Sequence, residues 1–143
     1  MPFIPFANLF PDLVEKEVRT VNIFDKNMGL PLGEYVFFEN YCNESGCDCH
    51  KVMVNVIGMN SQLPEILATL NFGWEGRNYY YQLFRGSEDA AEMAGSYLEP
   101  LGKQSEYASV CLEIWKAYGA ADQNYISRIK RHYAMFKSKI EGT

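Results

Sequence analysis

The sequence predicts an α+β domain, in which an antiparallel β-meander forms early in the chain and helices then cover one of its faces. Two observations support this class. Apolar and aromatic residues with a period of two run through residues 19–85, whereas apolar residues spaced three and four apart recur through residues 87–141. Strands followed by helices are typical of α+β folds. The 143 residues fit a single domain spanning 1–143.

The predicted sheet follows a short N-terminal helix. Pro11 at a first-turn position, with Asp12 and Glu15 behind it, predicts a helix that ends near Val18. We then expect about five strands, separated by turn-forming residues. They cover residues 19–24, 34–41, 51–57, 66–74 and 78–84, and the last two are joined by a hairpin loop at 75–77.

About three helices are expected after the sheet. Ser87 can cap a first helix that reaches Leu98, and Ser105 can cap a second that ends at Gly119. Asp122 can cap the last helix. The apolar stripe of this helix consists of Ile126, Ile129, Tyr133, Phe136 and Ile140. Such a stripe predicts that the helices pack on one face of the sheet.

Composition and charge exclude several functional classes. A net charge of −5 disfavours nucleic acid as a partner, because an acidic surface repels phosphate groups. No signal peptide and no apolar run of about 18 residues is present, so we expect a cytoplasmic protein with no membrane partner. The motifs of P-loop, dinucleotide-binding, zinc-protease and α/β-hydrolase enzymes are also missing. A protein partner remains possible, and none of these sequence features indicates an enzyme.

Three of the four cysteines lie within eight residues, between two predicted strands. Cys42 closes one strand, while Cys47 and Cys49 lie two apart on the return, so their side chains point the same way. In a reducing compartment such a cluster is more typical of a metal site than of a disulfide. Zinc takes four ligands in a tetrahedron, with thiolate sulfurs about 2.3 Å away. We therefore expect zinc, with a Cys42–Cys47 disulfide or three ordinary thiols as alternatives.

Two histidines compete for the fourth ligand position. His132 lies at the edge of the apolar stripe of the last helix, from which it can reach the sheet. His50 directly follows the third cysteine, and neighbours on a strand point to opposite faces, so His132 is favoured and His50 is the alternative. Otherwise Asp48, Glu44 or water would take the position, and a bound water would leave a catalytic possibility. Cys111, on the buried stripe of a helix, is expected in the core.

Several short tracts resemble an uncharacterised family of small bacterial proteins that has a C-x4-C-x-C motif and a C-terminal Arg-His-Tyr tract. The tracts are Phe10-Pro11-Asp12-Leu13, Gly33-Glu34-Tyr35, Glu39-Asn40-Tyr41-Cys42, Cys47-Asp48-Cys49 and Arg131-His132-Tyr133. In that family a basic residue usually follows the third cysteine. The resemblance therefore counts against His50 as a ligand and in favour of His132, and it implies no activity.

Taken together, these features predict a small zinc-binding domain whose site is structural and whose role is that of an interaction or adaptor protein. A zinc-dependent enzyme with an open fourth position is one alternative, and a thiol-based redox or metal sensor is another. Three thiolates donate much charge to zinc and make it a poorer Lewis acid, which counts against the enzyme.

Overall fold

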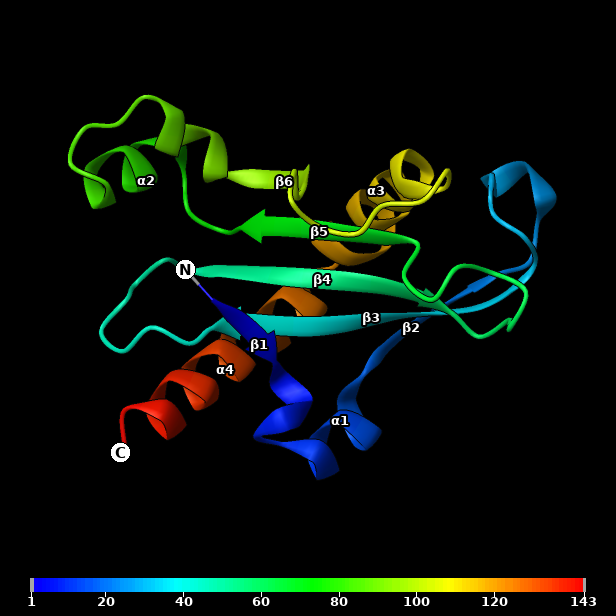
Figure 1. The fold of residues 1–143 in the computed structure, drawn as a ribbon, viewed down its shortest axis with the longest axis horizontal. Coiled ribbons are helices and arrows are strands. Elements are labelled where there is room, and N and C mark those ends of the chain that lie inside the picture. The colour runs from blue at the N-terminus through cyan, green and yellow to red at the C-terminus, as the bar shows by residue number, and fades with distance from the viewer. Residues whose placement is uncertain (1, 143) are drawn as a thin grey trace.

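The computed structural model describes residues 2–142 and contains a six-stranded antiparallel sheet with helices behind it (Figure 1). The strands are β1 (Phe3–Pro5), β2 (Arg19–Ile23), β3 (Gly33–Cys42), β4 (Lys51–Gly58), β5 (Ala68–Gly73) and β6 (Gly95–Leu98). Their order is β1-β3-β4-β5-β6, and β2 also pairs with β3. The predicted α+β class is confirmed, with one strand more than expected.

Four α-helices accompany the sheet within residues 2–142. They are α1 (Pro11–Glu17), α2 (Arg77–Leu83), α3 (Ala108–Trp115) and α4 (Gln123–Ile140), and a π-helical turn (Lys116–Ala120) follows α3. Asp122 caps α4 as predicted, because its carboxylate accepts hydrogen bonds from the backbone N–H groups of Asn124 and Tyr125. No helix in the described part of the chain is long and apolar enough to cross a membrane.

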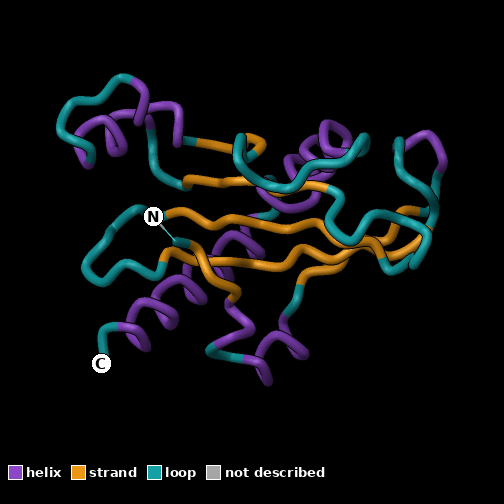
Figure 2. Tube along the Cα trace, viewed as in Figure 1, coloured by secondary structure: helices purple, strands orange, loops and turns teal. Residues whose placement is uncertain are grey.

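Strand β3 is the organising strand of the sheet, because three others pair with it. On one side it pairs with β4, and on the other it pairs with β2 along its first half and with β1 along its last three residues. Helix α1 connects β1 to β2 at this same edge (Figure 2). The N-terminal segment therefore packs beside the end of β3, where the predicted site begins.

The core fills the space between the sheet and helices α3 and α4. The Phe37 ring of β3 contacts Trp115 of α3 edge to face, with ring centroids 5.3 Å apart. The indole N–H of Trp115 donates to the Ser96 hydroxyl on β6, so its one polar atom is satisfied. Other fully or nearly fully buried members are Tyr41, Val52, Val54, Val56, Leu70, Tyr125, Ile129 and Phe136. The apolar stripe predicted for the last helix thus faces the sheet.

The aromatic segment expected as a fifth strand is a helix. Residues 77–83 form α2, whose Tyr80 is fully buried and donates from its hydroxyl to the carbonyl of His50 at 2.8 Å. Tyr80 also packs against Gly73, where any side chain would collide with its ring. The tyrosines have high strand propensity, but this tertiary contact outweighs that preference.

The first helix expected after residue 86 is also absent. A 3-10 turn covers residues 89–93, and residues 95–98 form β6, which pairs with β5 from Leu70↔Leu98 to Gly73↔Gly95. Residues 77–83 form a helix and do not pair with β5. The free backbone N–H and C=O groups of β5 are instead hydrogen-bonded by β6. Residues 95–98 therefore occupy the position beside β5 that was expected for residues 78–84.

Candidate metal centre

Three cysteines converge at the end of β3. The sulfurs of Cys42, Cys47 and Cys49 all lie within 4.8 Å of one another, and they form the only group of three or more potential metal-binding side chains found in residues 2–142. Cys42 is the last residue of β3, and the other two belong to the connection between β3 and β4. Cys42 and Cys49 are completely buried, whereas Cys47 is half-buried. The predicted convergence of the three thiols is thus present.

The connection that carries Cys47 and Cys49 is hydrogen-bonded to α4, which Figure 2 shows beside it. The carbonyl of Cys47 accepts a hydrogen bond from the Tyr133 hydroxyl at 3.1 Å, and the carbonyl of Glu44 accepts one from the Lys137 ammonium at 2.8 Å. Gly46 allows the loop to turn back, because its φ of 78° lies in the left-handed region that favours glycine. Two backbone carbonyls of the loop are therefore fixed to a helix far away in the sequence.

A second left-handed residue, His50, directs the chain from the cysteines into β4. Its φ is 49°, and its carbonyl is held by the N–H of Trp74 and the hydroxyl of Tyr80. Its Nδ1 lies 2.9 Å from a carboxylate oxygen of Glu75, and its ring stacks on Tyr79 with centroids 5.0 Å apart. The structure therefore leaves His50 outside the cysteine group.

Burial shapes the chemistry of the thiols. Burial, followed by the charges of the two neighbouring thiols, raises the pKa of Cys49 to about 12. The pKa of Cys47 is also raised, first by burial and then by Cys42. In the absence of a bound metal ion, the protonated form of these two thiols is thus favoured. A bound divalent cation would reverse this preference, because a metal-coordinated thiol loses its proton.

Two buried lysines stand beside the thiols. Lys51 is only 4% exposed, and its ammonium lies over the rings of Phe3 and Tyr97 at 5.7 Å and 5.5 Å. Burial lowers the pKa of Lys51, while the charges of the cysteines and of Glu99 raise it. The second buried lysine is Lys137 of α4, and its charge lowers the pKa of Cys49. Both cations favour negative charge on the sulfurs.

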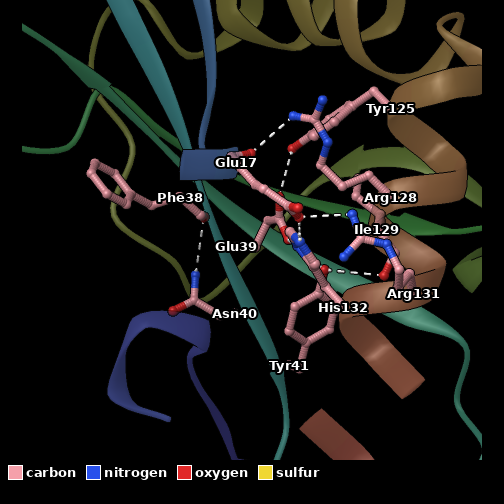
Figure 3. Close-up of polar contacts among 10 residues, drawn as sticks. All are labelled: Glu17, Phe38, Glu39, Asn40, Tyr41, Tyr125, Arg128, Ile129, Arg131 and His132. Carbon is pink, nitrogen blue, oxygen red and sulfur yellow. Dashed lines mark hydrogen bonds and ion pairs between the residues drawn. The ribbon is translucent and has the colours of Figure 1, made fainter. Parts of the chain in front are cut away.

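His132, the favoured fourth ligand, lies in a different cluster. Its Nδ1 is 2.7 Å from Glu39 Oε1, and its Nε2 is 2.7 Å from Glu17 Oε1 (Figure 3). Its ring stacks on Phe6 with centroids 4.3 Å apart, and the residue is 2% exposed. Because carboxylates occupy both ring nitrogens, the structure does not bring His132 to the cysteines. The expectation that His132 is the fourth ligand therefore has no support from its position in this structure.

Glu39 is the buried centre of this second cluster. One of its oxygens accepts from the Tyr41 hydroxyl at 2.6 Å, and the other accepts from the Tyr125 hydroxyl at 3.2 Å. Each ring nitrogen of His132 faces a carboxylate oxygen, and only a ring with a proton on both nitrogens could donate to both. Sequence reasoning missed both glutamates, although Glu39 lies two residues from the inward-facing Phe37 and Tyr41 and therefore shares their face of β3. A carboxylate on the buried face of a strand signals a buried partner.

The fourth cysteine, Cys111, belongs to the core. It lies on α3, is completely buried, and burial raises its pKa to about 12. It is not grouped with the other cysteines, as expected.

Comparison of the chain with family models, curated proteins and solved structures finds no match. The resemblance to a family of small bacterial proteins therefore stays a prediction, and the case for a function depends on the geometry of the site.

Proposed function

We propose that Cys42, Cys47 and Cys49 bind one zinc ion as thiolates, and that the ion is structural in a small interaction or adaptor domain. The observation that carries the proposal is the mutual distance of the sulfurs. In a tetrahedral site with zinc–sulfur bonds of about 2.3 Å, the sulfurs stand about 3.8 Å apart. Sulfurs within 4.8 Å of one another are already close to that spacing.

The surroundings favour zinc over other metals. Thiolate sulfur is a soft ligand that zinc accepts readily, whereas magnesium and calcium prefer oxygen. An iron–sulfur cluster normally needs four cysteines, and the fourth, Cys111, is buried elsewhere in the core. Three thiolates and a zinc ion together carry a charge of −1, which the buried ammonium groups of Lys51 and Lys137 offset.

Bound zinc would connect parts of the fold that are distant in the sequence. It would fix Cys42 at the end of β3 to the connection that follows, and that connection is already hydrogen-bonded to Tyr133 and Lys137 of α4. Because the unfolded chain has no preformed site, the free energy of zinc binding adds to the free energy of folding. This is why we propose a structural role for the ion.

Elemental analysis of protein purified without added metal tests the proposal. We expect one zinc ion per chain in the wild type and loss of that ion in Cys49→Ala. Cys111→Ala is the matched control, since it removes another completely buried thiol outside the group. That variant should keep its zinc and lose only modest stability. A folded wild-type protein without zinc, or a Cys111→Ala variant that loses it, would contradict the proposal.

A further inference from the structure

The three grouped cysteines differ in their access to solvent. Cys42 and Cys49 are completely buried, whereas Cys47 is half-buried. Cys47 also lines a surface hollow between the β3–β4 connection and the end of α2, where Leu83 and Phe84 form the opposite wall. A small molecule that approaches the group from solvent therefore meets Cys47 before the other two.

The connection that carries Cys47 is fixed by hydrogen bonds that do not involve the thiols. The backbone N–H of Gly46 donates to the Glu141 carboxylate at 2.7 Å, and the carbonyl of Asp48 accepts from the Tyr79 hydroxyl of α2. These bonds add to the two from α4 that hold the same connection. Because they join backbone groups to side chains other than the proposed ligands, they keep the thiols grouped when a bound ion leaves.

The accessible sulfur has two possible disulfide partners in its own chain. The sulfurs of Cys42 and Cys49 both lie within 4.8 Å of the Cys47 sulfur. An oxidised, electrophilic sulfur at Cys47 is therefore next to thiols that can attack it, and no second chain is needed. Cys111 is completely buried and lies outside this group, so it shares neither the access nor the neighbours.

We infer that the cysteine group is a peroxide-sensitive switch, in which Cys47 is oxidised first and a disulfide within the chain then releases the zinc ion. This inference rests on the proposed zinc site. Coordination to zinc keeps Cys47 as a thiolate, which is the form that attacks an oxidant. The ion therefore presents a reactive sulfur at the one position of the group that solvent reaches.

The reaction with hydrogen peroxide has two steps. First, the Cys47 thiolate attacks one peroxide oxygen, the O–O bond breaks, the sulfur becomes a sulfenic acid, and hydroxide leaves. Second, the thiolate of Cys42 or Cys49 attacks the oxidised sulfur, the S–S bond forms, and a second hydroxide leaves. Two thiolates thus lose two electrons, and the peroxide gains them. The zinc ion stays Zn²⁺ and is released, because two of its three thiolate ligands have become a neutral disulfide.

Treatment of the zinc-loaded protein with hydrogen peroxide tests the inference. A chromogenic chelator measures zinc release, and peptide mass mapping in the presence of dimedone, which traps sulfenic acids, identifies the oxidised cysteine. We expect the first sulfenic acid at Cys47 and one zinc ion released for each disulfide formed. Cys111 is the internal control and should stay unmodified. Dithiothreitol and added zinc should then restore one ion per chain, because the hydrogen bonds of the connection keep the thiols grouped.

A ligand variant sharpens the test. Cys47→Asp replaces the accessible sulfur with a carboxylate oxygen, which zinc also accepts as a ligand but which peroxide does not oxidise. The zinc-loaded variant should therefore release its ion about tenfold more slowly in peroxide. Cys111→Ala is the matched control and should release zinc at the rate of the wild type. The order of oxidation in the wild type tests the same point without any substitution.

The possible failures can be told apart. A folded wild-type protein that contains no zinc would overturn the zinc site and this inference with it. Zinc that stays bound in peroxide, or a first oxidation at Cys42 or Cys49, would overturn the inference and leave the zinc site standing. The same holds if Cys47→Asp releases zinc as fast as Cys111→Ala does. Zinc that cannot be restored by reduction would show damage in place of a switch.

Discussion

Replacing His132 by alanine separates the buried ion cluster from the metal site. The substitution removes two contacts of 2.7 Å and leaves Glu39, whose side chain is 5% exposed, without its histidine partner. Breaking a buried charge pair costs about 3–5 kcal/mol, because the remaining charge stays desolvated. In a chain of this size we therefore expect the melting temperature to fall by about 10–15 °C. The zinc content should not change, since His132 lies outside the cysteine group.

Thermal unfolding measures the loss of stability, and elemental analysis of the same preparations measures the zinc content. His50→Asn is the control, because asparagine tolerates the left-handed backbone and the lost contact with Glu75 is partly exposed, worth about 0–1 kcal/mol. Adding Glu39→Gln to His132→Ala should recover part of the lost stability, since it removes the uncompensated charge. If the stability losses of His132→Ala and Glu39→Gln simply add in the double variant, our account of the cluster is refuted. It is also refuted if a folded His132→Ala protein lacks zinc.

Two further predictions concern charges. The hydrogen bond from His132 lowers the pKa of Glu17 below its ordinary value of 4.5. The ionised carboxylate of Glu17 therefore stabilises the fold above pH 4.5. This stabilisation is lost as the pH falls through the lower pKa of the folded state. Glu17→Gln should therefore flatten the loss of stability in urea titrations from neutral pH down to about pH 3. Lys51→Met keeps the volume but removes a buried charge beside the thiols, and in competition with a chelator it should weaken zinc binding by about tenfold. The exposed Lys26→Met is its control, and equal affinities in the two variants would contradict a role for Lys51.

The parts of the fold that local patterns determine could be predicted from the sequence. Alternating valines identify β4, and the capping carboxylate of Asp122 with the apolar stripe behind it identifies α4. The grouping of the three thiols could also be predicted from local spacing, because a short turn joins Cys42 to Cys49. In each case the residues that interact are close in the sequence, so spacing alone brings them together.

The remaining parts depend on contacts that spacing does not encode. Tyr80 lies on a helix because its ring packs against Gly73 and its hydroxyl reaches His50. The helical period correctly predicts that His132 points toward the sheet. It does not predict whether the side chain meets the thiols or a carboxylate there. The choice follows from the register of β3, which places Glu39 on the inner face opposite α4.

The buried glutamate on β3 also has a consequence for synthesis on the ribosome. Glu39 precedes His132 by 93 residues. At translation rates of about 5–20 residues per second, the carboxylate waits about 5–20 s for its imidazole partner. During that interval Glu39 has neither Tyr125 nor His132 beside it, because both belong to α4. The part of the core around Glu39 can therefore form only after α4 has been synthesised.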